Sequence, residues 1–147
     1  GVSTQNAYGG VGFGHDGSSV TYSNKGGGGG GGAGGAGQGA TTSAGGDGGA
    51  GKASTITGSS VFYAPGGPAG GYSTSIGSYV DGSVSSYGAG GNGGNYSQAA
   101  SSDGADGVCI IATQQAATAT TGSPTVDTSS RSGWYVYTFT SNGTITF

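Results

Sequence analysis

Seven consecutive glycines, Gly26 to Gly32, constrain the fold of this 147-residue chain most, and the run continues as Ala-Gly-Gly-Ala-Gly to Gly37. Glycine inside a helix or strand costs roughly 0.5–1 kcal/mol per residue relative to alanine. Such a tract therefore favours neither structure. Two possibilities remain. The tract is disordered, or it forms an extended polyglycine II helix, which resembles polyproline II, has no internal hydrogen bonds and packs laterally against similar helices.

The composition favours the ordered alternative. The chain holds 39 glycines without a strict period, which is typical of low-complexity disorder. Disordered chains, however, carry many charges and few aromatic residues. This chain has nine Tyr, four Phe and one Trp, and only 6% of its residues are charged. We therefore expect packed glycine tracts, supported by one another or by other copies of the chain.

Charge and hydropathy exclude two classes of partner. The net charge is −3 with only three Lys and Arg residues, too few to neutralise a run of phosphates, so nucleic acid is not an expected partner. No apolar run approaches the roughly 20 residues of a membrane span, so no membrane insertion is expected. The chain begins at Gly1 rather than Met and shows no signal peptide, which indicates a processed product or a fragment.

Three short Ser/Val/Tyr segments are each followed by a glycine-rich tract. They are residues 17–22, 58–63 and 82–87, and a fourth tract occupies residues 45–51. The spacing between them is unequal, so the chain is not a solenoid of fixed period. For residues 1–107 the sequence predicts stiff glycine rods joined by aromatic-bearing turns.

Residues 108–147 have a different, β-prone character. Val108–Ala112 is a predicted apolar strand in which Cys109 is expected to be a buried small hydrophobe, and Gln114–Ser130 is a predicted loop. Residues 133–140 alternate over aromatic and β-branched side chains, and Asn142-Gly143 separates them from a second alternating run. Asn-Gly in this position predicts a C-terminal β-hairpin. Because both faces of its first strand carry aromatic rings, both are expected to contact protein.

The predicted fold class is therefore mostly β and irregular, with laterally packed polyglycine II-type strands, a C-terminal β-hairpin and few or no helices. The 1–107 region and the 108–147 region are expected to form one composite domain.

Several phrases of the sequence resemble the glycine-rich domains of bacteriophage tail and fibre proteins. They are Gly-Gly-Ala-Gly-Gly-Ala-Gly, the Ser-Thr-Ile-Thr-Gly-Ser-Ser-Val-Phe-Tyr of residues 54–63, the Asp-Gly-Val-Cys-Ile-Ile of residues 106–111 and the closing residues 137–147. The resemblance covers roughly residues 8 to 147. It implies a polyglycine II bundle whose loops at one end bind a host surface, as in fibre-tip adhesins.

The motifs of catalysis are not found. His15 is the chain's one histidine, and beside Asp16 it is expected to form an exposed loop pair. Gly51-Lys52-Ala53 lacks the hydroxyl that completes a phosphate-binding loop. Asp103 and Asp106 lack the order of an EF-hand. We predict a protein without catalytic, metal-binding or cofactor-binding residues, and hence without a cofactor.

Two sets of residues are candidates for function. Tyrosines in Ser/Gly/Asn-rich loops are suited to surface recognition, although the same rings could instead cover the glycine rods; they are Tyr72, Tyr79, Tyr87 and Tyr96. Assembly and packing are expected of Gly26, Gly28, Gly30, Gly32, Gly34, Gly35, Gly37, Trp134, Tyr135, Tyr137 and Phe139. Asn95 and Asn142 begin glycosylation patterns, which matter only in a glycosylating host.

The leading functional interpretation is a non-enzymatic structural protein of a viral or extracellular fibre. It would present aromatic loops to a bacterial surface protein or glycan, as a homotrimer on a virion or outside the cell. The alternative is a self-assembling extracellular filament subunit. An ice-binding polyglycine protein is the third and less favoured interpretation. Such a protein would require a regular Gly-x-x period and usually disulfides, and this chain has neither.

Overall fold

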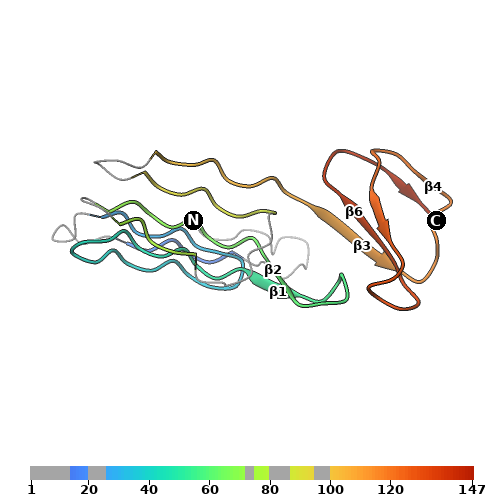
Figure 1. The fold of residues 1–147 in the computed structure, drawn as a ribbon, viewed down its shortest axis with the longest axis horizontal. Helices are drawn as coiled ribbons and strands as arrows, with labels where there is room; N and C mark the ends of the chain where they lie inside the picture. Colours follow the sequence, from blue (N-terminus) through green and yellow to red (C-terminus); the bar gives the residue numbers. More distant parts are fainter. Residues whose placement is uncertain (1–13, 20–25, 72–74, 80–86, 95–99) are drawn as a thin grey trace. The chain divides into compact units, whose positions relative to one another are not determined.

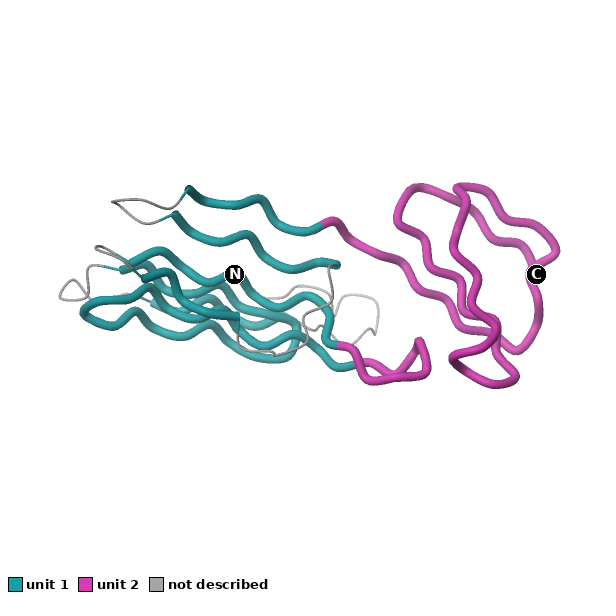
Figure 2. The backbone as a smooth tube through the Cα atoms, in the orientation of Figure 1, with its two compact units in different colours: residues 1–53, 62–105 teal, residues 54–61, 106–147 magenta. Residues whose placement is uncertain are grey.

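The computed structural model describes residues 14–19, 26–71, 75–79, 87–94 and 100–147. These residues contain no helix, which confirms the prediction of a mostly β and irregular fold. The chain divides into two compact units (Figure 2). The first comprises residues 1–53 and 62–105, and the second comprises residues 54–61 and 106–147.

The first unit is built from extended glycine-rich segments, here called rods, that lie side by side (Figure 1). Rods 26–32 and 64–71 run antiparallel, and every third N–H of one donates to every third carbonyl of the other. The pairs are Gly27 to Gly70 at 3.0 Å, Gly30 to Gly67 at 2.9 Å and, just beyond the first rod, Ala33 to Ala64 at 2.9 Å. A β-ladder repeats every two residues, whereas a polyglycine II-type helix has three residues per turn. The spacing of three residues between these hydrogen bonds is therefore that of polyglycine II-type rods and not of a β-ladder.

The same spacing of three joins the other rods. Rod 44–51 runs parallel to rod 26–32 and donates to it from Gly46 to Gly27 and from Gly49 to Gly30. Rod 64–71 runs antiparallel to rod 44–51 and donates to it from Gly66 to Gly49 and from Ala69 to Gly46. Rod 87–94 donates to rod 64–71 from Gly90 to Pro65 and from Gly93 to Pro68, and segment 100–105 donates to rod 87–94 from Ser102 to Asn92 and from Ala105 to Ala89. Each rod thus satisfies its backbone on several sides, as a helix without internal hydrogen bonds requires.

The close approach of these backbones explains the glycine content. A Cβ at Gly29 would fall on the Asp47 carbonyl oxygen, and a Cβ at Gly48 would fall on that of Gly66. Among the described glycines, positive φ angles occur only at Gly58, Gly88, Gly122 and Gly133, all outside rods 26–32, 44–51 and 64–71. Glycine is needed in these rods for space and not for left-handed conformations.

Four tracts of the first unit carry side chains three residues apart. They read x-Gly-Gly-x, with Ala33 and Ala36, Asp47 and Ala50, Pro65 and Pro68, and Ala89 and Asn92 at the x positions. One side of a three-fold rod can therefore carry a Cβ while the other two meet neighbouring backbones. The chain as a whole lacks a strict glycine period, but each tract has a local one.

The second unit contains two small antiparallel sheets. β6 (Tyr135–Phe139) lies between β3 (Cys109–Thr113) and β5 (Thr125–Asp127). β4 (Ala119–Thr120) pairs with β7 (Ile145–Thr146). Elsewhere in the chain, β1 (Lys52–Ser54) pairs with β2 (Val61–Tyr63).

The core of the second unit is strand β6. Its Val136, Tyr137 and Phe139 side chains are 2%, 4% and 7% exposed. Val136 and Tyr137 are neighbours and point to opposite faces, so the prediction that both faces contact protein is confirmed. On the Tyr137 face, the Ala117 N–H donates to the tyrosine hydroxyl at 2.7 Å. The Phe147 ring meets the Tyr137 ring edge-on at 6.4 Å.

Strands β3 and β6 confirm two sequence predictions, but the predicted C-terminal hairpin is wrong. β6 has both edges occupied by β3 and β5, which leaves no edge for β7. β7 pairs instead with β4, where Thr118 N–H donates to the Thr146 carbonyl at 2.8 Å and Thr121 N–H to the Thr144 carbonyl at 3.0 Å. The bend at residues 140–142 thus carries the chain from one sheet to the other.

Two further expectations for the second unit are wrong. Residues 114–130, predicted as a loop, contain β4 and β5, because their threonines and Val126 supply the β-branched side chains that strands favour. Cys109, predicted as buried, is exposed because β3 is the outermost strand of its sheet.

Candidate binding surfaces

The structure describes two of the four tyrosines expected to recognise a surface. Tyr72 and Tyr96 lie outside the described residues. Tyr79 and Tyr87 are both half-buried. The Tyr79 hydroxyl donates to the Gly90 carbonyl at 2.5 Å, so this side chain helps to satisfy and cover a rod.

The glycines expected to pack fall into two groups. A Cβ at most of them would collide with a neighbouring backbone: Gly28 with Ser18, Gly32 with Ala50, Gly34 with Gly51, Gly37 with Gly29, and Gly26 with Ala44. At Gly30 and Gly35 the nearest atoms would be 3.5 and 3.4 Å away, which is ordinary contact.

Other glycines, outside the set expected to pack, are equally crowded. They include Gly29, Gly31, Gly45, Gly46, Gly48, Gly49 and Gly66. For Gly45, Gly46, Gly48, Gly49 and Gly66 the x-Gly-Gly-x pattern was a signal that could have identified them, because the central glycines of these repeats face neighbouring rods. Gly29 and Gly31 lie in the uninterrupted glycine run, where the pattern is absent.

The aromatic residues expected to assemble the chain belong to the second unit. Tyr137 and Phe139 are its core, while Trp134 and Tyr135 are half-buried. The Arg131 guanidinium lies 3.8 Å from the centroid of the Trp134 ring, an arrangement that stabilises the turn between β5 and β6.

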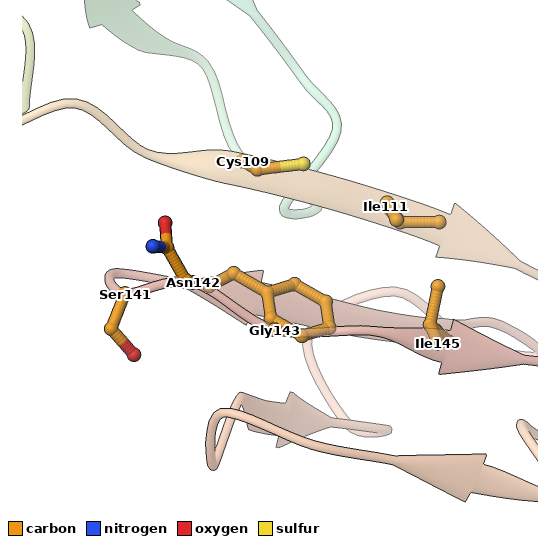
Figure 3. A pocket seen from close by; sticks show the side chains of 7 residues that line it. Cys109, Ile111, Ser141, Asn142, Gly143 and Ile145 are labelled. Carbon is orange, nitrogen blue, oxygen red and sulfur yellow. The ribbon is translucent and has the colours of Figure 1, made fainter.

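A small apolar hollow of about 260 Å3 lies in the second unit. Strand β3 supplies Cys109 and Ile111, β6 supplies Phe139, and β7 supplies Ile145. Figure 3 shows Ile111 and Ile145 on opposite sides of the hollow, with Ser141 and Asn142 at one end. A second hollow of about 230 Å3 shares Cys109, Phe139 and the 141–142 turn. The volume of each hollow is suited to one or two apolar side chains and is below that of a typical small-molecule site.

The β5–β6 turn is held by Asp127. Its Oδ1 accepts from the Ser129 N–H at 2.8 Å, the Ser129 hydroxyl at 2.9 Å and the Ser130 N–H at 3.1 Å. Hydrogen bonds from Ser130, and then from Ser129, hold the pKa of the Asp127 carboxyl well below its ordinary value. A carboxyl with a depressed pKa stabilises the fold above its unfolded pKa, and this stabilisation is lost as the pH falls towards the folded pKa.

We therefore expect the Asp127→Asn variant to lose much of the acid sensitivity of the second unit below about pH 4, the ordinary range for aspartate. Asparagine keeps an acceptor for the serine donors but does not titrate. Trp134, the chain's one tryptophan, provides a fluorescence signal for thermal unfolding between pH 7 and pH 3. Asp106→Asn, at an exposed position outside the turn, is the control and should behave as the parent chain does. If the thermal stability of Asp127→Asn falls between pH 7 and pH 3 as much as that of the parent chain, this role is contradicted.

Metal-binding clusters and membrane-spanning helices are absent from the described residues. Among them, no group of three or more His, Cys, Asp or Glu side chains is placed to hold a metal ion. His15 is exposed. In the same part of the chain, no helix is long and apolar enough to span a bilayer.

Comparison with known proteins corrects the family expectation. Residues 89–108 match the family described as MHC_I C-terminus. The expected resemblance to bacteriophage tail and fibre proteins is therefore wrong, because the family found is an MHC class I family. The matched segment is a small part of the chain, so it identifies no family for the chain as a whole. No curated protein and no solved structure matches the chain.

Proposed function

We propose that the chain is a non-enzymatic structural module of an extracellular fibre. The observation that carries this proposal is the three-residue hydrogen-bond ladder among glycine rods whose backbones exclude a Cβ. Such a bundle has few side chains with which to perform chemistry, and its backbone groups are used in lateral bonds. A rigid spacer or scaffold is the role that this construction serves best.

Two further parts of the proposal concern partners. The chain would associate with copies of itself as a homo-oligomer. Its aromatic loops between rods would attach to a bacterial surface protein or glycan. Of the four candidate tyrosines, Tyr79 and Tyr87 lie in the described part of the chain, and the Tyr79 hydroxyl donates to the Gly90 carbonyl.

Amide hydrogen exchange tests the structural role. The N–H groups of Gly30, Gly46 and Gly66 are bonded between rods, so we expect them to exchange at least about tenfold more slowly than unstructured chain. Residue-resolved exchange by nuclear magnetic resonance on the full chain measures this rate. The exposed amides of Ser101 and Gly107 serve as internal references.

Exchange of the rod amides at the unstructured rate would overturn the scaffold proposal, since a spacer without fixed lateral bonds is a flexible linker. Discrete oligomers or filaments in negative-stain images of the purified chain would support self-association, and monomers at all concentrations would contradict it.

A further inference from the structure

Strands β3 and β5 are the two edge strands of the three-stranded sheet, and they differ in the features that discourage pairing with another chain. Proteins protect sheet edges with charges, prolines or very short strands. The β5 edge has three residues, follows Pro124 and ends in Asp127. The rod segment 100–105, which bonds to rod 87–94, carries Asp103.

β3 has none of these protections. It is five residues long, Cys-Ile-Ile-Ala-Thr, without charge or proline. Within the described residues it is paired on one side only, with β6. An uncharged apolar strand with a free row of backbone donors and acceptors is the feature that a further strand recognises.

The apolar hollow lies beside the same strand. Cys109 and Ile111 line it, and residues two apart on a strand share a face. Because β3 is outermost in its sheet, a strand added alongside it would bring its own side chains next to the hollow. The hollow lies beside β3 (Figure 3), so an edge strand without charge or proline and an apolar hollow occur at one place.

We propose that β3 pairs antiparallel with β3 of a second copy, centred on Ile111, and so joins two three-stranded sheets across a two-fold axis. This inference rests on the proposed structural role, for which it names the contact between copies. Centring on Ile111 is the register that pairs all five residues of both strands. Slipped registers leave residues of each strand unpaired.

A second copy fits this edge because the pairing is self-complementary. Cys109 lies opposite the partner subunit's Thr113, and Ile111 lies opposite the partner subunit's Ile111. Opposed residues share a face, with Cβ atoms about 4.5–5.5 Å apart. Each copy therefore places an isoleucine beside the other's hollow, and neither strand brings a charge into the contact. A two-fold interface of this kind closes on itself.

The register can be tested by cross-linking. In the Thr113→Cys variant, Cys109 of one copy faces the new thiol of the other, at a Cα separation of about 4.5–5.5 Å that a disulfide can bridge. Mild oxidation of the full chain should therefore convert most of it to a disulfide-linked dimer on a non-reducing gel. Within one chain, positions 109 and 113 are about 13 Å apart along the strand, too far for a disulfide.

Three matched controls isolate the register. The parent chain should not cross-link, because the two Cys109 thiols are offset by four residue positions. Thr113→Cys combined with Cys109→Ser removes the opposing thiol and should also remain uncrosslinked. Ala112→Cys places its thiol on the other face of β3 and should cross-link weakly. Light scattering of the unoxidised parent chain should show a dimer that dissociates on dilution.

A monomeric parent chain together with an uncrosslinked Thr113→Cys variant would overturn the β3 contact, and equal cross-linking of Ala112→Cys would do so as well. Rod amides that stay protected in those cases leave the scaffold proposal intact. Register-specific cross-links in a chain with unprotected rod amides would support the contact and overturn the scaffold.

Discussion

Alanine at position 29 should destabilise the first unit by about 1–3 kcal/mol or more, whereas alanine at the neighbouring position 30 should be neutral or slightly stabilising. A Cβ at Gly29 would fall on the Asp47 carbonyl, so rods 26–32 and 44–51 would have to separate. A Cβ at Gly30 would be 3.5 Å from the nearest atoms of Gly67. The two variants remove similar freedom from the unfolded chain, so their difference reports the close approach of the rods.

Differential scanning calorimetry and limited proteolysis of the two variants measure this difference. Gly30→Ala is a matched control because it lies in the same tract and extends the row already occupied by Ala33 and Ala36. Gly29→Ala should melt at a lower temperature and be cut faster within the tract. Equal melting temperatures and equal cleavage rates of the two variants would contradict the packing of the rods, because a Cβ at Gly29 would then be no more crowded than a Cβ at Gly30.

Glycine content and low charge together predicted the kind of packing in the first unit, but they did not predict which rods pack against one another. A run such as Gly26–Gly32 leaves only disorder or lateral packing, and the low charge favoured the latter. Which rod neighbours which depends on where the chain reverses, and a side-chain-free tract carries no information on that. The local x-Gly-Gly-x repeat does specify which positions face neighbours, and it is visible in the amino-acid sequence itself.

The second unit shows why a local turn signal failed. Asn142-Gly143 favours reversal of the chain, but pairing across it requires a free edge on β6. β3 and β5 occupy both edges through contacts between residues far apart in the sequence. The threonines at 118 and 121 offered β7 an alternative partner within a segment that composition alone marked as a loop.

The candidate surfaces were predictable to different degrees. The aromatic alternation of residues 135–139 identified a strand that is covered on both faces. The hollow could not be identified, because it forms only where β3, β6 and β7 meet. The exposure of Cys109 follows from the position of β3 in its sheet, and hydrophobicity along the chain does not determine which strand is outermost.

Phe139→Ala should cost the second unit about 3–5 kcal/mol, the usual range for removing a buried phenylalanine. Phe139 is one of three buried apolar side chains on β6, and the hollow beside it leaves few atoms that could move in to fill the space. Phe147→Ala removes the same group from a side chain that is 48% exposed. It should cost about 1 kcal/mol, mainly through the lost edge-on contact with Tyr137. Urea unfolding followed by Trp134 fluorescence compares the two variants, and equal losses would show that β6 is not the core of this unit.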